Sequence, residues 1–318
     1  MQVMNTMHAN GKLLLTGEYL VLVGAKALAV PLVVGQKLVF EEISIPGVLH
    51  WEAYDTDGKW FSAKYYLPEI TEIEASDYAV SARLIKLLQA ARLLNPDFLY
   101  TKTGISVITE LEFNRNYGFG SSSTLISLIA GWAGIDAMQL HRNVSKGSGY
   151  DVACSNSDRA IFYSLTNGLP MVEAVDFNPP FAENMFLVYL GAKQHSDLEV
   201  EAFTKSTGID YSIEIERLSR ISDLIASEKD IYNFISLLTE HEAILSKVLN
   251  RATVKSRLFP EFEGAVKSLG AWGGDFILAV SALGKDYIKD YFSSKMHNTV
   301  IPYDALNHNR FDIKAVQV

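Results

Sequence analysis

A loop rich in glycine and serine joins a strand-like segment to a helix-like segment, and this junction constrains the fold more than any other feature of the chain. Residues 104–113 (GISVITELEF) alternate apolar and polar side chains, which predicts a strand with one solvated face. Residues 116–123 (NYGFGSSS) follow, and an apolar segment continues to Gly134. Serine and glycine suit the start of a helix, where backbone N–H groups lack partners and the helix dipole favours anions. The junction therefore fits either an anion-binding loop or an ordinary turn with a serine cap.

Composition limits the class of protein. The chain has 318 residues, of which 48% are hydrophobic and 20% charged, and this balance predicts a globular protein of one large or two ordinary domains. The formal net charge of −9 argues against a nucleic-acid partner, which needs a broad basic surface. No apolar run reaches membrane-spanning length and residues 1–12 do not resemble a signal peptide, so no membrane partner is expected. The single cysteine, Cys154, cannot form an internal disulfide and predicts a cytoplasmic location.

The two halves of the chain differ in their predicted structure. In the first half, strands are expected over 36–45, 48–55 and 60–67, and a helix is expected from Asp77 to a point before Asn95. In the second half we expect a strand at 186–193, two or three helices between 210 and 250, a helix, glycine turn and strand over 259–284, a helix at 285–294 and a strand at 298–306. These patterns predict an α+β protein with an N-terminal domain 1–166 and a C-terminal domain 167–318.

Three further segments are chemically unusual, and each has a structural interpretation beside a functional one. Lys12, within residues 10–32, precedes an apolar strand, where a lysine is usually a solvated surface residue. Asp151, within residues 147–157, follows two glycines and can simply cap a helix. Residues 268–276 contain three glycines in five positions, which suits a tight connection between a helix and a strand.

Several common motifs are missing from the sequence. No glycine is followed at the required spacing by Gly-Lys-Ser/Thr, so there is no Walker A loop. Gly118-Phe119-Gly120 lacks the third glycine of the dinucleotide-binding pattern. No His and Cys residues have the spacing of zinc ligands, and Ser148 has no identifiable His partner for nucleophilic catalysis.

Taken in chain order, the four unusual segments resemble the motifs of the GHMP small-molecule kinases, named for galactokinase, homoserine kinase, mevalonate kinase and phosphomevalonate kinase. The matching residues are Gly11-Lys12 with Gly17-Glu18 in the N-terminal motif, 117–123 in the phosphate loop, 147–153 around the catalytic aspartate and 270–276 in the third glycine motif. The resemblance implies an α+β, two-domain fold. Its N-terminal domain would be ribosomal protein S5 domain 2-like, its C-terminal domain a ferredoxin-like α/β domain, and its active site would lie in the cleft between them.

The resemblance also implies ATP-dependent phosphoryl transfer with Mg²⁺, and a role for each matching residue. Asp151 would orient the acceptor and accept its proton, while Lys12 would neutralise charge near the transferred phosphoryl group and keep Asp151 ionised. Ser122 would hold Mg²⁺. The residues expected at the ATP phosphates are Gly118, Phe119, Gly120, Ser121, Ser122 and Ser123. Those expected at the acceptor are Glu18, Tyr19, Lys193, Ser196, Gly273, Gly274 and Asp275.

The resemblance points to mevalonate or phosphomevalonate as the acceptor, because Gly17-Glu18-Tyr19 and Gly149-Tyr150-Asp151 look most like the phosphomevalonate kinases. Two departures keep alternatives open. Trp272 stands where these kinases usually have a small residue, and residues 139–141 (QLH) stand where mevalonate kinases have a magnesium-binding glutamate. The alternatives are a kinase for a sugar or an amino alcohol and a non-catalytic nucleotide or metabolite sensor. Either way we expect a monomer or homodimer.

Overall fold

The computed structural model describes residues 5–191, 196–204, 209–270, 272 and 275–306. Contacts divide the chain into two units: unit 1 comprises 1–11, 34–115 and 119–156, and unit 2 comprises 12–33, 116–118 and 157–318. Two long strands, β1 (Asn5–Thr16) and β2 (Ala27–Ile43), contribute residues to both units. The predicted boundary between 166 and 167 falls in the turn of a hairpin within unit 2, so the division into domains 1–166 and 167–318 stays a prediction.

Unit 1 combines a sheet with helices, and the α+β prediction is confirmed. Its strands run in the order β5-β4-β3-β6-β2, with β3 and β6 parallel and the other pairs antiparallel. The elements that unit 1 adds are β3 (Val48–Asp55), β4 (Gly58–Tyr66), β5 (Thr71–Ala75), β6 (Gly104–Leu111), α1 (Tyr78–Leu94), α2 (Ser121–Ala133), α3 (Ala137–Val144) and α4 (Tyr150–Ser155).

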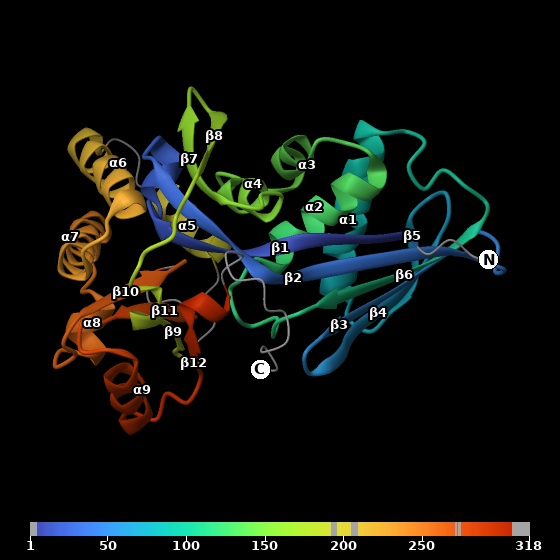
Figure 1. Ribbon diagram of the computed structural model, residues 1–318. Helices are drawn as coiled ribbons and strands as arrows, with labels where there is room; N and C mark the ends of the chain where they lie inside the picture. The colour runs from blue at the N-terminus through green and yellow to red at the C-terminus, as the bar shows by residue number, and fades with distance from the viewer. Residues whose placement is uncertain (1–4, 192–195, 205–208, 271, 273–274, 307–318) are drawn as a thin grey trace. The chain divides into compact units, whose positions relative to one another are not determined.

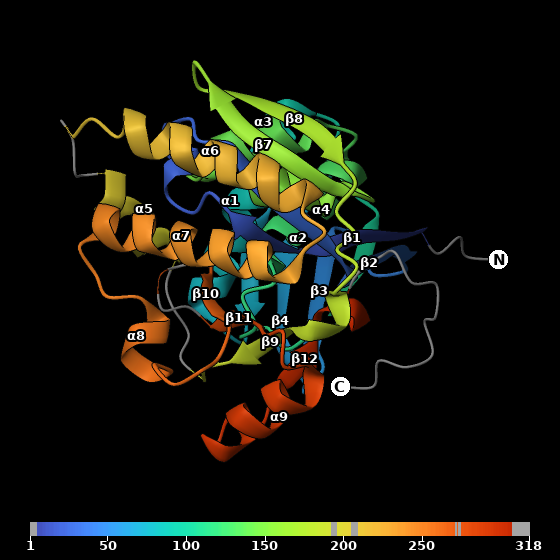
Figure 2. The same ribbon diagram turned by 60° about the vertical axis from the view of Figure 1, so that its left-hand side comes forward.

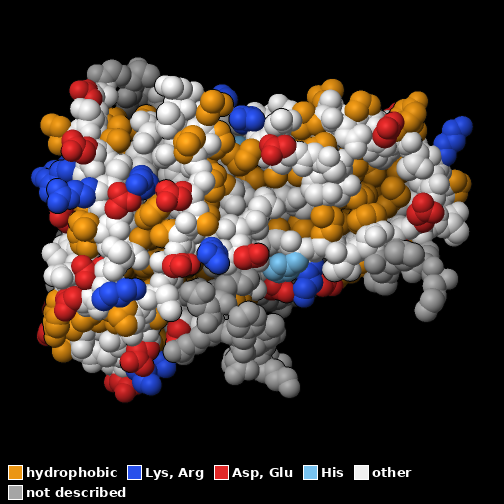
Figure 3. Space-filling view, turned by 45° about the horizontal axis from the view of Figure 1, so that its top comes forward, with side chains coloured by type: hydrophobic (Ala, Val, Ile, Leu, Met, Phe, Trp, Pro, Cys, Tyr) orange, Lys and Arg blue, Asp and Glu red, His pale blue; other side chains and the backbone are white. Residues whose placement is uncertain are grey.

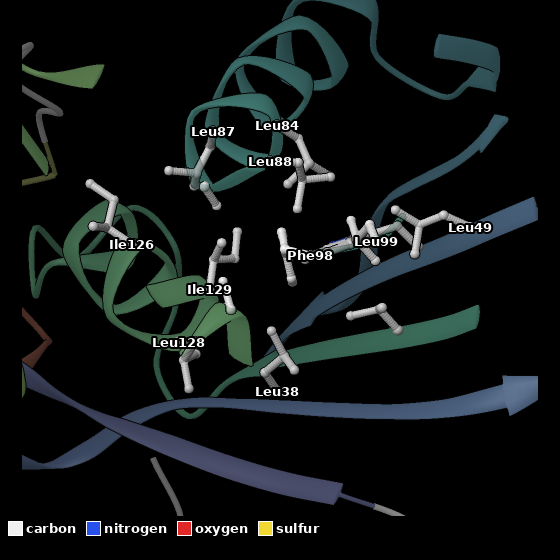
Figure 4. Close-up of a cluster of buried hydrophobic side chains, with 14 of the residues drawn as sticks. Leu38, Leu49, Leu84, Leu87, Leu88, Phe98, Leu99, Ile126, Leu128 and Ile129 are labelled. Carbon is white, nitrogen blue, oxygen red and sulfur yellow. The ribbon is translucent and has the colours of Figure 1, made fainter. Parts of the chain in front are cut away.

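The core of unit 1 lies between α1, α2 and the sheet. Figure 4 shows Leu84, Leu87 and Leu88 of α1 facing Ile129 of α2, with Leu38 of β2 also pointing into the cluster. The bounds of α1 agree with the sequence: Asp77 accepts the N–H groups of Ala79 and Val80 as the N-cap, and the helix ends before Asn95-Pro96. This buried contact fixes the position of α2, whose first turn carries the serines.

Unit 2 begins with strands and continues with a second, antiparallel sheet of order β10-β11-β9-β12. A hairpin of β7 (Ala160–Thr166) and β8 (Leu169–Val175) pairs with Ala27–Ala29 of β2. The second sheet comprises β9 (Met185–Tyr189), β10 (Ala265–Leu269), β11 (Phe276–Val280) and β12 (Val300–Pro302). The helices are α5 (Ser196–Thr204), α6 (Ser212–Ser227), α7 (Ile231–Leu249), α8 (Val254–Leu258) and α9 (Lys285–Ser294), with short 3-10 turns at Leu20–Val23, Ala182–Asn184 and Tyr303–Ala305.

Figures 1 and 2 show α6 and α7 lying side by side, and α7 packs against β10. The two helices confirm the prediction of amphipathic helices between 210 and 250. The helix predicted at the start of 259–284 is wrong, because residues 265–269 form β10. All five residues of β10 are buried, and the strand is hydrogen-bonded to β11. Lys267, at the centre of this strand, is fully buried.

The molecular surface drawn in Figure 3 intermixes Lys and Arg with Asp and Glu side chains. Some of these charges pair directly, as Lys26 does with Asp223 at 2.6 Å. Within the part of the chain that the structure describes, no helix is both long and apolar enough to cross a membrane.

Candidate active site

The glycine-serine segment ends at the N-terminus of α2, in unit 1. Gly120 is the N-cap, with φ 96°, and it has no side chain to accept the N–H groups of the first turn. The first helical bond runs from the Thr124 N–H to the Gly120 carbonyl at 2.9 Å, so the N–H groups of Ser121, Ser122 and Ser123 precede the intrahelical ladder. Such N–H groups, together with the positive end of the helix dipole, form a site suited to phosphate.

The three serines differ in exposure. Ser123 is buried and its hydroxyl donates to the Gly120 carbonyl at 2.8 Å, which closes the turn. Ser122 is exposed, so its hydroxyl can reach a ligand from solvent. Phe119 is buried, with its ring 5.5 Å from that of Phe113. The loop is therefore held by the buried Phe119 and Ser123, while Ser122 faces solvent.

Buried hydrogen bonds tie α2 to α4, the helix that carries Asp151. The hydroxyls of Ser127 and Ser155 are 2.7 Å apart, and the Asn156 side-chain amide donates to the Ser127 hydroxyl at 2.9 Å. Unit 1 thus fixes two predicted site elements, the serine turn and the aspartate helix, relative to each other.

Asp151 lies in the first turn of α4 and is half-buried. Its Oδ1 accepts the Val152 N–H at 3.0 Å, whereas the N-cap of α4 is Gly149, with φ 86°. A carboxylate in a first turn is stabilised by the helix dipole. His141 of α3 is buried nearby: burial lowers its pKa, and the Asp151 carboxylate opposes this shift without reversing it. His141 is therefore a neutral imidazole at neutral pH.

A second group of predicted residues meets within unit 2. Lys12 is 8% exposed, and its Nζ donates to the Gly118 carbonyl at 3.1 Å. The surface position that its residue type alone suggests is therefore wrong. Gly118 also lies against Asp275, because a Cβ added to Gly118 would be 2.7 Å from the Asp275 Oδ2. The structure thus brings three predicted site residues together: a lysine of the first motif, a glycine of the phosphate loop and an aspartate of the third motif.

The Gly17-Glu18-Tyr19 segment is held by a buried polar network of α7 and β10. The Gly17 N–H donates to the Nε2 of His241 at 3.0 Å, and the Glu18 carboxylate pairs with the ammonium of Lys267. Glu242 completes the network, with its Oε1 3.9 Å from the Lys267 Nζ and 3.6 Å from the His241 Nδ1. All four ionisable side chains are buried, so we call this group the buried ionic network.

Burial dominates the pKa values of this network. It raises the pKa of Glu242 to about 7, against the opposing effects of Lys267 and of hydrogen bonds from Ser268. It lowers the pKa of His241 to about 3, with the Lys267 charge acting in the same direction and Glu18 opposing. Because the His241 Nε2 accepts the Gly17 N–H, the neutral ring carries its proton on Nδ1, toward Glu242.

Sequence reasoning did not identify Lys267, His241 or Glu242. The available signal was a lysine within the apolar strand segment AVKSL and an adjacent His-Glu pair on an amphipathic helix. Neither signal names its partner, since Glu18 lies more than two hundred residues earlier in the chain.

The remaining residues predicted on the acceptor side are only partly covered by the described chain. Lys193, Gly273 and Gly274 lie outside the described residues, and Ser196 is the first residue of α5. Arg115, which directly precedes the glycine-serine segment, has its guanidinium 5.1 Å from the centre of the Trp60 ring and its Nε 3.9 Å from the Asp55 carboxylate. Among the described residues, no group of three or more His, Cys, Asp or Glu side chains is arranged to hold a metal ion.

Comparison with known structures shows which fold these elements form. Mevalonate kinase of L. major, solved with R-mevalonate, has a TM-score of 0.68 and 13% identity, with 94% of this chain and 96% of that chain covered. Phosphomevalonate kinase of Streptococcus pneumoniae, solved with phosphomevalonate and AMPPNP, has a TM-score of 0.67 and 16% identity, covering 91% and 96%. Galactokinase of Lactococcus lactis, solved with galactose, has a TM-score of 0.64 and 12% identity, covering 93% and 92%. The chain has the GHMP kinase fold.

The expected fold is thus confirmed over nearly the whole chain. The sequence matches no protein-family model and no curated protein. Within the GHMP kinase fold, function depends on the residues of the site, so the likeness alone does not choose among the acceptors of these kinases.

Proposed function

We propose that this protein is an ATP-dependent small-molecule kinase that phosphorylates mevalonate or phosphomevalonate. The observation that carries the proposal is the pair of helices α2 and α4, joined by the buried Ser127–Ser155 hydrogen bond. One helix presents three serine N–H groups and the other presents Asp151. Phosphoryl transfer needs positioned charge more than covalent chemistry, and this pair supplies both an anion site and a carboxylate.

Each residue has a distinct role in this proposal. The N–H groups of the serine turn bind the nucleotide phosphates, and Lys12, held at the Gly118 carbonyl, compensates their negative charge. Asp151 orients the acceptor and takes its proton. Asp275, with Lys193, Ser196, Gly273 and Gly274, belongs to the acceptor side. A cytoplasmic location, consistent with the single buried Cys154, is part of the proposal.

Magnesium fits the residues present. Ser122 offers an exposed hydroxyl at the start of α2, and a hydroxyl with phosphate oxygens and water is a donor set that Mg²⁺ accepts. Bound there, the ion would offset charge on the phosphate oxygens. Residues 139–141 add no acidic ligand, because Gln, Leu and His carry no carboxylate.

The alternative of a non-catalytic sensor loses one of its supports. Trp272 was unusual because of its size, but its side chain is buried and its Nε1 donates to the Ala252 carbonyl at 3.3 Å. A bulky residue with a defined place in unit 2 gives no sign of a degenerated site. The sugar alternative keeps the support of the galactokinase likeness and belongs in the test.

The test is a coupled ADP-release assay with ATP and Mg²⁺, using mevalonate, phosphomevalonate, homoserine and galactose beside a control without acceptor. With an alcohol acceptor, Asp151→Asn should lower kcat about 10²–10⁴-fold, because the hydroxyl must lose a proton during attack. The effect should be smaller with a phosphate acceptor, which is already an anion. Asp136→Asn is the matched control, since Asp136 caps α3 through the Gln139 N–H and asparagine caps equally well. ATP binding without any acceptor-dependent rate would contradict the kinase and favour the sensor.

A further inference from the structure

Tyr19 contacts both chain segments on which acceptor-binding residues are expected. The Trp272 N–H, in the turn between β10 and β11, donates to the Tyr19 hydroxyl at 2.7 Å. On its other side, the Tyr19 ring lies 5.6 Å from the ring of Phe203 on α5. The β10–β11 turn ends at Asp275 and α5 begins at Ser196, so one side chain joins two segments far apart in the sequence.

Further contacts bring the same segments together. The Arg251 guanidinium pairs with Glu199 of α5 at 2.8 Å, and the next residue, Ala252, accepts the Trp272 indole N–H. Phe203 also stacks on Tyr211, with the two ring centres 5.7 Å apart. Tyr19 thus belongs to a connected set of contacts within unit 2.

The backbone of Tyr19 has an unusual conformation. Its φ of 62° and ψ of −52° lie outside the regions that L-residues ordinarily occupy. Such a conformation costs free energy and persists only where neighbouring contacts impose it. Here the buried ionic network imposes it, through His241 on the Gly17 N–H and Lys267 on the Glu18 carboxylate.

The Tyr19 side chain is 6% exposed, and its hydroxyl oxygen already accepts a hydrogen bond. Burial raises the pKa of Tyr19 to about 12, so the phenol stays neutral at working pH. The side chain is buried, neutral and bonded through its oxygen to the Trp272 backbone, so its contacts are with neighbouring segments of unit 2.

We infer that Tyr19 is a positioning residue that holds Trp272, between β10 and β11, and α5 in place for the acceptor, a role that rests on the proposed function. This changes the expectation from the sequence, in which Tyr19 was an acceptor contact. The Gly17-Glu18-Tyr19 motif would then form the acceptor side by fixing other segments through buried bonds.

The first experiment measures hydrogen–deuterium exchange in the ligand-free protein and needs no activity. Tyr19→Phe removes the acceptor of the Trp272 N–H, so exchange at this amide should become at least about fivefold faster. Tyr65→Phe is the matched control: the Tyr65 hydroxyl is also buried, lies 3.2 Å from the Ser81 hydroxyl, and its pKa is likewise raised by burial to about 12. That variant should leave exchange at Trp272 unchanged.

The second experiment measures kinetics with the acceptor that the ADP-release assay identifies. Tyr19→Phe should raise the KM for the acceptor about fivefold while the KM for ATP changes less than twofold. A general loss of stability would affect both substrates and would also follow from Tyr65→Phe. Phe203→Leu removes the ring contact between α5 and Tyr19 and leaves the Tyr19 hydroxyl in place. This variant should also raise the KM for the acceptor.

The outcomes separate the possibilities. A raised acceptor KM with unchanged exchange at Trp272 would mean that Tyr19 touches the acceptor directly, which overturns the positioning role. Faster exchange with both KM values unchanged would overturn the link to the acceptor. If the wild-type protein shows no acceptor-dependent rate, the proposed function fails and the acceptor role falls with it, while the exchange comparison still decides whether Tyr19 holds the turn.

Discussion

Replacing Lys267 with methionine removes the cation of the buried ionic network and nearly conserves the volume of the side chain. Lys267 is fully buried, and its ammonium contacts Glu18, lies 3.9 Å from Glu242 and donates to the Ser268 carbonyl at 2.7 Å. Without it, two buried carboxylates lose their compensating charge. Removing one partner of a buried ion pair costs about 3–5 kcal/mol, far more than the pair itself contributes.

The cost should depend on pH in a defined direction. Burial already raises the pKa of Glu242 to about 7, and Lys267 is the main group opposing that shift. In Lys267→Met the pKa of Glu242 must rise further, so the carboxyl takes up a proton in the folded state. Proton uptake by the folded variant favours folding as the pH falls. The destabilisation relative to wild type should therefore be larger at pH 7.5 than at pH 5.5.

Urea unfolding followed by circular dichroism at both pH values measures the effect. Lys26→Met is the matched control, because Lys26 forms a 2.6 Å ion pair with Asp223 whose two side chains are 34% and 50% exposed. An exposed pair of this kind contributes at most about 1 kcal/mol. Equal destabilisation by the two substitutions, or a loss that does not shrink at pH 5.5, would refute the argument from buried charge.

Two other substitutions test named contacts. Gly118→Ala should lower kcat/KM for ATP about tenfold or more, because the Gly118 φ is 41° and the new Cβ, 2.7 Å from the Asp275 Oδ2, would displace that carboxylate. Gly134→Ala is the matched control: its φ is 64° and its Cβ has open space, so it should lower stability by ~1 kcal/mol and leave kcat/KM unchanged. Glu112→Gln should lower the free energy of unfolding by on the order of 2 kcal/mol at pH 7, because the ionised carboxylate stabilises the folded state. Urea unfolding should show this difference from wild type vanish as the pH falls from 4.5 towards 2 and the carboxylate is protonated. A difference that stays constant with pH would contradict this reasoning. Burial raises the pKa of Glu112, but three hydrogen bonds outweigh burial and bring it to about 2, those from His8, Lys37 and the Gly35 N–H.

The fold was predictable from the sequence wherever one local signal decided an element. α1 combined an apolar face with a capping aspartate and a terminating Asn-Pro, and it begins and ends where these residues place it. β10 was mistaken for a helix, and a local pattern cannot show that the lysine at its centre is neutralised by Glu18. The burial of Lys267 is a tertiary property, which period and propensity do not encode.

The candidate site likewise has features that the local sequence predicts and contacts that it cannot predict. Glycines and serines at a strand-to-helix junction predict a phosphate turn from their own chemistry, and the structure gives α2 an N-terminus of that kind. The polar contacts that support the site are different, since each joins residues distant in sequence. Ser127 is hydrogen-bonded to Ser155 on the helix of Asp151, and His241 accepts the Gly17 N–H, yet the local sequence around neither residue identifies its partner.

Trp272 shows how a departure from a motif can be structural. Its backbone N–H, which any residue except proline could supply, donates to Tyr19, so the turn does not need an indole for that bond. The indole adds a hydrogen bond to the Ala252 carbonyl and a large buried surface, and both stabilise the position of Trp272. A small residue at this position would lose the bond to Ala252 and keep only the backbone bond to Tyr19 of these two contacts. The backbone conformation of Tyr19 depends on the buried ionic network. The bond from the Trp272 indole to Ala252 does not involve that network, so it positions Trp272 independently of it.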